Sequence, residues 1–135
     1  MAERLRLDVV TPRCRVLECR ADEVRIPAAL GELGVLPGHT PLLTSLGTGE
    51  VTWFDGDTTG RLVVQGGIAE VQPHAVTVLA TIAETVDEID VEAARADAAE
   101  AREALKSASV DEFANLDAVL RLAEARISAA ARSGA

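Results

Sequence analysis

Aromatic side chains are scarce in this chain of 135 residues, at 2% of the sequence, and tyrosine is absent. Proteins that hold single-stranded nucleic acid stack its bases on aromatic rings, and Trp53, Phe54 and Phe113 are too few for such a platform. Basic residues are outnumbered by acidic ones, 13 to 22, and the resulting net charge of −9 would repel a phosphate backbone. These shortages exclude a nucleic-acid partner from our expectations.

Long hydrophobic runs are also missing. No apolar stretch approaches the ~20 residues that a membrane-spanning helix needs. The opening residues 1–4 have neither the apolar core of a signal peptide nor the acid-poor pattern of a transit peptide. We therefore expect no direct membrane insertion and a chain that is cytosolic as made.

Cysteine is nearly absent. Cys14 and Cys19 lie five positions apart, and this odd offset on a strand would point them to opposite faces, so we expect no disulfide between them. His39 and His74 do not supply the spacing of ligands that zinc requires, so no metal site is expected either.

Residues 1–88 have the patterns of a β domain. Leu5, Leu7 and Val9 alternate with polar residues, which is typical of a half-buried strand. The runs 62–64 and 76–79 are short, mainly apolar and rich in branched residues, as in strands buried on both faces. Turn signals rich in glycine and proline separate these segments, and Asp55-Gly56 predicts a hairpin. Many short strands with regular turns indicate a sandwich or a barrel.

Residues 89–135 have the patterns of two helices. Alanine supplies 16 of the last 45 residues, and it has the highest intrinsic helix propensity. Asp90 is placed to cap the first helix, and Ser109 with Glu112 forms a capping box for the second. A short break between them predicts an antiparallel hairpin. The spacing predicts two apolar stripes: Val91, Ala94, Ala98, Ala101 and Leu105 on the first helix, and Phe113, Leu116, Leu120, Ala123 and Ile127 on the second.

The alanine-rich stripe buries little apolar area, so the hairpin should be the less stable part of the molecule. Weak docking suits an element that moves, but a static helical cover would have the same sequence pattern. Both alternatives stay open at this point.

No catalytic constellation is present in the sequence. Neither histidine lies near a nucleophile elbow, and no spacing selects a pair of carboxylates from the many acids. The segment 47–50 is rich in glycine but lacks the lysine and the following helix of a phosphate loop. We therefore expect a protein that is not an enzyme by itself.

One stretch of fourteen residues carries more information. The segment 31–44, GELGVLPGHTPLLT, strongly resembles the hallmark of the epsilon subunit of F-type ATP synthase. The segments 7–11, 66–71 and 76–80 are similar to other signatures of that family, in the same order. The resemblance extends over essentially the whole chain, including the alanine-rich hairpin.

The resemblance implies an α+β fold, with an N-terminal β-sandwich of about ten strands over residues 1–88 and an antiparallel helical hairpin over residues 89–135. It implies a non-catalytic rotor subunit of the central stalk, on the cytoplasmic face of the bacterial inner membrane. The sandwich would link the gamma subunit to the ring of c subunits and so couple proton flow to ATP synthesis. The hairpin would extend into the alpha–beta head and inhibit ATP hydrolysis.

The resemblance also implies particular contact residues. Glu32 would lie in a loop that faces the c ring, and His39 would lie near the contact with gamma and the ring. Arg121, Arg126 and Arg132 of the second helix would approach an acidic segment of the beta subunit. Because residues 91–135 carry 6 basic and 8 acidic groups, that attraction should be modest and sensitive to salt. We accordingly expect weak to moderate inhibition.

Some members of the family bind ATP as a regulatory ligand, where the first helix meets the sandwich. Their motif is an aliphatic residue, Asp, two variable residues, and then Arg-Ala. Ile89 and Asp90 match its start, but Ala93 stands at the arginine position and the nearest arginine is Arg95. A start at Val91-Glu92 would make Arg95-Ala96 fit but would replace Asp with Glu, so the match is incomplete in either register. The candidate ATP site therefore consists of Glu84, Ile89, Asp90, Arg95 and Arg126.

Two other classes of protein compete with this interpretation. A free-standing β-sandwich that binds a ligand or senses a nucleotide would have the same composition and would be stable apart from any membrane complex. An independent hydrolase would need turnover by the chain alone, and the sequence offers no triad, metal set or phosphate loop for it.

Overall fold

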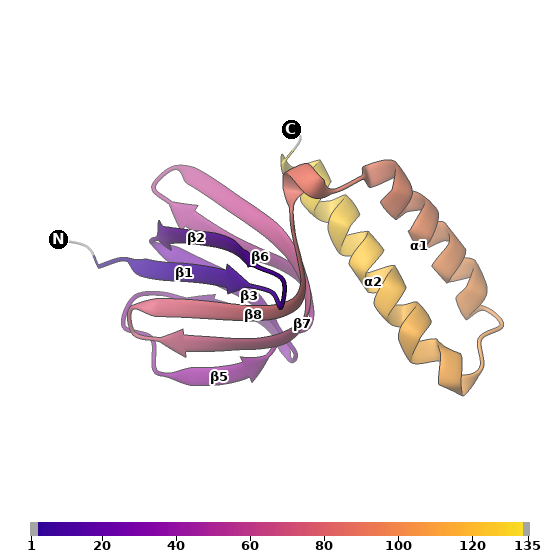
Figure 1. Ribbon diagram of the computed structural model, residues 1–135, viewed down its shortest axis with the longest axis horizontal. Coiled ribbons are helices and arrows are strands. Elements are labelled where there is room, and N and C mark those ends of the chain that lie inside the picture. The colour runs from indigo at the N-terminus through magenta and orange to yellow at the C-terminus, as the bar shows by residue number, and fades with distance from the viewer. Residues whose placement is uncertain (1–2, 134–135) are drawn as a thin grey trace.

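The computed structural model of the chain describes residues 3–133. The strands are β1 (Leu5–Val10), β2 (Arg15–Ala21), β3 (Glu23–Ala28), β4 (Gly31–Val35), β5 (Leu42–Ser45), β6 (Thr48–Asp55), β7 (Thr58–Gln72) and β8 (Ala75–Thr85). The helices are a short 3-10 turn, η1 (Val86–Glu88), followed by α1 (Val91–Leu105) and α2 (Val110–Ser133). The strands form one body, and the two helices lie side by side at one end of it (Figure 1).

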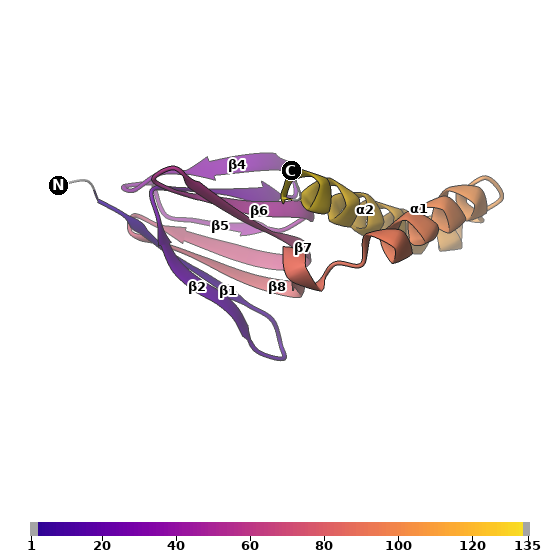
Figure 2. The same ribbon diagram turned by 90° about the horizontal axis from the view of Figure 1, so that it is seen from above.

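The strands in residues 3–133 form one continuous sheet that folds into two layers. Its order is β2-β1-β8-β7-β6-β3-β4, and β5 is added beside β7. β7 changes partner along its length, because it pairs with β6 up to Gln65 and with β5 from Ile68 onward. Gly66 and Gly67 lie between these two parts with φ of 73° and 106°, a conformation that favours glycine. This corner lets one strand contribute to both layers, which Figure 2 shows from above.

The predicted architecture, a β-sandwich followed by a helical hairpin, is confirmed. The number of strands differs, since residues 3–133 contain eight where the resemblance implies about ten. β7 and β8 are 15 and 11 residues long, and their register is the same on both sides of the corner. Gln65 pairs with Ile82 before the corner, and Gly67 pairs with Ala80 after it. Each long strand therefore bends at the corner and continues into the other layer as one strand, which lowers the number of separate strands.

The core between the layers is aliphatic, as the scarcity of aromatic residues predicts. Leu5, Leu7 and Val9 are fully buried on one face of β1. The run 62–64 is buried on both faces as expected, because Leu62 and Val64 point into the sandwich while Val63 lies under α2. The same expectation is wrong for the run 76–79. Its last residue, Leu79, is 43% exposed on the outer face of the sheet.

The hairpin predicted at Asp55-Gly56 joins β6 to β7. Asp55 pairs with Thr58, so the turn consists of two residues, and Gly56 has a positive φ of 61°. A glycine in this position lets the turn follow the right-handed twist of the two strands. The predicted hairpin is confirmed.

Both predicted helix caps are present. The backbone N–H of Ala93 donates to Asp90 Oδ1 at 3.0 Å at the start of α1. At the start of α2, the N–H of Ser109 donates to Glu112 Oε1 at 3.0 Å, and the N–H of Glu112 donates to Ser109 Oγ at 3.3 Å. Each cap satisfies backbone donors that have no partner within the helix.

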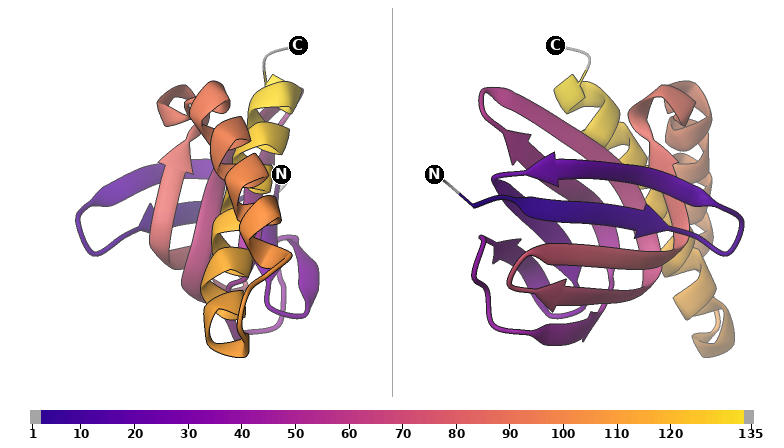
Figure 3. Two further views of the ribbon diagram at one scale, coloured as in Figure 1. Left: turned by 90° about the vertical axis from the view of Figure 1, so that its right-hand side faces the viewer. Right: turned by 60° about the vertical axis from the view of Figure 1, so that its left-hand side comes forward.

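The predicted stripe on α1 agrees with the burial of Ala94, Ala98 and Ala101. The stripe predicted for α2 is incomplete. Leu122 and Ala129 are buried beside Ala123, whereas Phe113 is 54% exposed. The reason is that α2 packs against α1 on one side and against β6 and β7 on another, so it needs two apolar faces. Figure 3 shows the two helices from the side on which they lie over the sandwich.

The sequence analysis also made predictions about membrane-spanning helices, a disulfide and a metal site, and the structure of residues 3–133 bears on each of them. None of the helices in this range is both long enough and apolar enough to cross a membrane. Cys14 is exposed, Cys19 is half-buried, and both are free thiols. Within the same range, no group of three or more His, Cys, Asp or Glu side chains is arranged to hold a metal ion.

Candidate functional site at the hairpin seam

The seam is the contact between α2 and the sandwich, and it is small. Val63, Leu122 and Ala129 form its buried apolar centre. Four half-buried residues surround this centre: Ile82, Val86, Ile89 and Ala125. Because α1 packs mainly against α2, the hairpin is attached to the sandwich through one helix.

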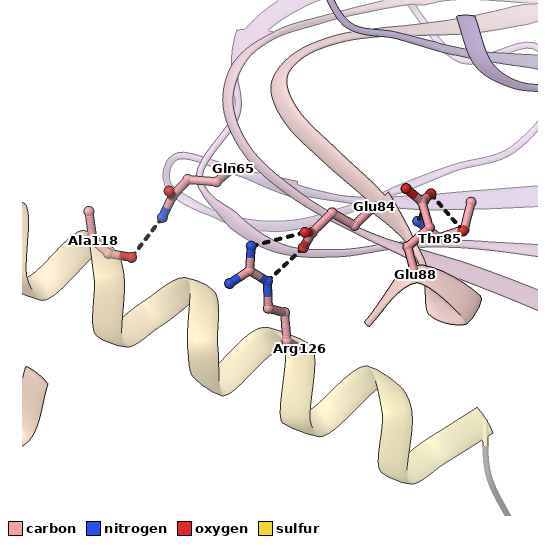
Figure 4. Close-up of polar contacts among 6 residues, drawn as sticks. All are labelled: Gln65, Glu84, Thr85, Glu88, Ala118 and Arg126. Carbon is pink, nitrogen blue, oxygen red and sulfur yellow. Dashed lines mark hydrogen bonds and ion pairs between the residues drawn. The ribbon is translucent and has the colours of Figure 1, made fainter. Parts of the chain in front are cut away.

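An ion pair lies beside this apolar centre. Arg126 of α2 donates from Nε to Glu84 Oε1 at 2.6 Å and from Nη2 to Oε2 at 2.9 Å. Each of the two side chains is 24% exposed. Figure 4 shows the guanidinium facing both carboxylate oxygens of Glu84, which extends from the end of β8. Such a two-bonded pair is stronger and more directional than an ordinary surface ion pair.

A second carboxylate, that of Glu50, contacts the C-terminal end of α2. Glu50 on β6 is 12% exposed, and its Oε2 lies 3.3 Å from Arg132 Nη1 and accepts from Ser128 Oγ at 3.3 Å. Its other oxygen, Oε1, lies 3.6 Å from Arg61 Nε on β7. Glu50 is therefore shared between an arginine of the sandwich and an arginine of the hairpin.

Gln65 adds a hydrogen bond near the middle of α2. Its Nε2 donates to the backbone oxygen of Ala118 at 2.9 Å (Figure 4). The same nitrogen also donates to Thr48 Oγ1 at 2.9 Å. Sequence reasoning identified neither Gln65 nor Glu50. Neither residue belongs to a motif in the sequence, and the packing of α2 over them brings them into contact with the hairpin.

The connection from β8 to α1 is held by a third carboxylate. Glu88 Oε1 accepts from the Thr85 hydroxyl at 2.8 Å and from the Thr85 amide at 3.2 Å (Figure 4). These two bonds, the hydroxyl bond first, lower the pKa of Glu88 from its ordinary value of 4.5. The turn between sandwich and hairpin thus has a defined geometry.

Comparison with known proteins identifies the family. The β-sandwich domain of the ATP synthase delta/epsilon chain matches residues 4–86. The ATP synthase epsilon chain 2 of Syntrophotalea carbinolica is 43% identical over 136 residues, covering 99% of this chain and 99% of that protein. The epsilon chain of Geotalea uraniireducens is 43% identical over 135 residues, covering 98% of each chain.

The chain belongs to the ATP synthase epsilon chain family. The resemblance seen in the sequence is thereby confirmed, and the chain is a non-catalytic subunit. The two full-length relatives extend across the hairpin as well as the sandwich.

The fold is also that of two solved structures. A chain of the Euglena gracilis mitochondrial ATP synthase, in a structure of OSCP, F1 and c-ring, aligns with a TM-score of 0.82 at 24% identity, covering 93% of this chain and 81% of that one. A chain of the Tetrahymena thermophila mitochondrial ATP synthase central stalk and c-ring aligns with a TM-score of 0.65 at 13% identity, covering 93% and 96%. At these identities the likeness concerns the fold alone.

The predicted ATP-site residues are only partly brought together. Glu84 and Arg126 bind each other, and Ile89 packs at the edge of the seam. Asp90 is occupied as the cap of α1. Arg95 points away, with its side chain 60% exposed and its Nη1 2.9 Å from Glu92 Oε1. ATP binding at these residues stays a prediction, and Nε and Nη2 of Arg126 are engaged by Glu84 in this structure.

The two residues predicted to face gamma and the c ring are not neighbours. Glu32 is the second residue of β4 and is exposed, so it lies in a strand rather than in a loop. It lines a polar cavity of about 400 Å³ together with Arg121 and Arg132 of α2. β4 runs away from the helices (Figure 2), and His39 follows its far end, next to a hydrogen bond from the Gly38 amide to Pro73 O at 2.6 Å. The contact roles of Glu32 and His39 stay predictions.

The three arginines predicted to reach the beta subunit are all engaged. Arg121 Nε donates to Asp117 Oδ2 at 2.9 Å within α2. Arg126 and Arg132 contact Glu84 and Glu50 of the sandwich. Two of the three therefore contribute to holding the hairpin down.

Proposed function

We propose that this chain is a rotor subunit of the central stalk of an F-type ATP synthase, where its sandwich links the gamma subunit to the ring of c subunits. In this role it couples proton flow to ATP synthesis without catalysing a reaction itself. The observation that carries the proposal is the 43% identity to epsilon chains over nearly the full length of both proteins. The matching fold in a central stalk and c-ring structure supports it.

The outer face of the layer that contains β5, β7, β8 and β1 is our candidate surface for gamma. α2 covers the other layer, where it packs against β6 and against the part of β7 that precedes the corner at Gly66 and Gly67. The face without α2 carries three large exposed apolar side chains. Leu43 is 66% exposed, Leu79 43% and Ile68 41%, and Ile68 pairs directly with Leu79. Adjacent exposed apolar side chains of this kind are typical of a protein–protein contact.

The proposed location is the cytoplasmic face of the bacterial inner membrane, as a peripheral subunit. The chain would be held there through the c ring and gamma. This follows from the stalk assignment and needs no membrane segment of its own.

We further propose that the hairpin can leave the sandwich, extend into the alpha–beta head and inhibit ATP hydrolysis. Attachment through α2 and a small apolar centre favours such a movement. Arg121, Arg126 and Arg132 would then meet an acidic segment of the beta subunit. With a net charge of −2 over residues 91–135, the inhibition should be weak to moderate.

Size-exclusion chromatography of the full chain with a matching alpha–beta–gamma head tests the stalk assignment. We expect a stoichiometric complex at low and at moderate salt, and a marked loss of that complex for Ile68→Glu. Leu30→Glu is the matched control, because Leu30 is fully exposed in the turn between β3 and β4. A folded wild-type chain that elutes alone under both conditions would contradict the proposal and favour the free-standing ligand-binding module.

A further inference from the structure

The arginines that hold the hairpin to the sandwich are among those assigned to the inhibitory contact. Arg126 uses two donors on the two oxygens of Glu84, at 2.6 and 2.9 Å. Arg132 lies 3.3 Å from Glu50. In both cases a cation of α2 meets a carboxylate of the sandwich, which is the same chemistry that an acidic partner segment would offer.

We propose that Glu84 and Glu50 act as intramolecular substitutes for the acidic partner, so that the docked and inhibitory positions of the hairpin compete for the same arginines. This inference rests on the proposed inhibitory function and deepens it. It explains why a docked hairpin would not inhibit ATP hydrolysis, because the arginines assigned to inhibition are then bound to Glu84 and Glu50.

The geometry makes the competition direct at Arg126. The Nε and Nη2 edge of the guanidinium is occupied by Glu84, so a partner carboxylate cannot take that edge until the pair separates. Both side chains are 24% exposed, so the pair is partly shielded from water and salt. Contact with the acidic partner would replace this ion pair with a similar one.

The second contact is built differently. Arg61 lies 3.6 Å from Glu50 and belongs to the sandwich, so it stays beside Glu50 when the hairpin leaves. Glu84 has no ion-pair partner other than Arg126 among residues 3–133. When the hairpin leaves, Glu50 keeps one arginine, whereas Glu84 loses its ion-pair partner among residues 3–133. Separation of the Glu84–Arg126 pair therefore opposes release more than separation of the Glu50–Arg132 pair.

The competition predicts opposite effects for the two halves of one ion pair. Glu84→Gln and Arg126→Gln both weaken docking, because each removes one charge of the pair. Glu84→Gln leaves Arg126 available to the partner, so inhibition should become stronger. Arg126→Gln removes the side chain that both positions use, so inhibition should become weaker.

The chain offers a matched control in the exposed pair Glu103 and Lys106, which lies at the end of α1. Glu103→Gln and Lys106→Gln make the same changes of charge within the hairpin. Neither variant should alter docking or inhibition. This control separates an effect of the Glu84–Arg126 contact from an effect of net charge.

Two readouts on the full chain test the inference. The first is the distance between spin labels at Asp57→Cys and Ser107→Cys, in a chain with Cys14→Ser and Cys19→Ala, which reports the undocked fraction. The second is ATP hydrolysis by the head reconstituted with each variant. We expect an undocked fraction about tenfold higher for both Glu84→Gln and Arg126→Gln, with inhibition changed in opposite directions.

Two results would overturn the inference. Undocking without opposite changes in inhibition, while the wild-type chain still inhibits, would reject the competition and leave the inhibitory function standing. A wild-type chain that docks as described but never inhibits would reject both. The label distances distinguish these cases, because they do not depend on the head.

Discussion

At the scale of single residues, Glu84 and Arg126 illustrate how a family pattern and a structure can assign one pair to different tasks. The resemblance implies that both belong to a nucleotide site. In the docked chain they bind each other through two hydrogen bonds. Ala93 stands where the ATP-binding members have arginine. In this structure Glu84 and Arg126 therefore serve as an ion pair between the sandwich and the hairpin.

Gly67 is the residue whose backbone the fold constrains most clearly. Its φ is 106°, and a Cβ added there would collide with the backbone oxygen of Leu79. We expect Gly67→Ala to lower the free energy of unfolding by at least about 1–3 kcal/mol through backbone strain alone, measured by urea denaturation. Gly34→Ala is the control, because its added Cβ would meet Glu23 at an ordinary 3.6 Å. Equal stability of the two variants would contradict this account of the corner.

At this scale, the sequence predicts a residue's role when its partners lie close by along the chain, and it fails when they lie far away. Asp90, Ser109 and Glu112 were predictable as caps, because a cap is decided within four residues. Glu50 and Gln65 were not, because each acquires its role from helix residues more than fifty positions away. Glu32 was placed in a loop through its glycine neighbours, and the pairing of β4 with β3 puts it in a strand.

At the scale of elements, both helices were predictable and their packing was not. Alanine content and spacing locate α1 and α2, since helix formation depends on local propensity. The second apolar face of α2 consists of Leu122, Ala125 and Ala129, which recur at 3,4 spacing on one side of the helix. It was missed because two of the three are alanines, and alanine also occurs on the other sides of α2. The partner exchange of β7 was missed for a similar reason, because strand pairing is decided over long distances along the chain.

The first turn of α2 should respond to pH through its capping box. Hydrogen bonds from the Ser109 amide and hydroxyl lower the pKa of Glu112 from its ordinary value of 4.5. Because the folded value is depressed, the stabilisation is complete above pH 4.5 and is lost as the pH falls through the folded value. An NMR titration of the Glu112 carboxyl should have its midpoint below 4.5, and Ser109→Ala should raise that midpoint part of the way back. A midpoint that Ser109→Ala does not move would show that the hydroxyl contributes nothing.

At the scale of the whole molecule, the chain combines two parts with buried apolar clusters of very different size. The sandwich has one large aliphatic core, while the hairpin is attached by a small apolar centre and a few polar contacts. The exposed row of Leu43, Ile68 and Leu79 lies on one layer, and α2 lies over the other. This separation is compatible with our proposal that a partner binds the sandwich at its outer face while the hairpin moves.

The most direct test of the central claim, that docking and inhibition exclude each other, is to fix the hairpin in place. Gln65 and Ala118 contact each other across the seam, so Gln65→Cys and Ala118→Cys can be joined by a reagent that a reductant cleaves. Cys14→Ser and Cys19→Ala remove the native thiols, and ATP hydrolysis by the reconstituted head is measured before and after reduction. We predict no inhibition while the hairpin is tethered and a return of inhibition once the tether is cleaved. Equal inhibition in both states would contradict the account.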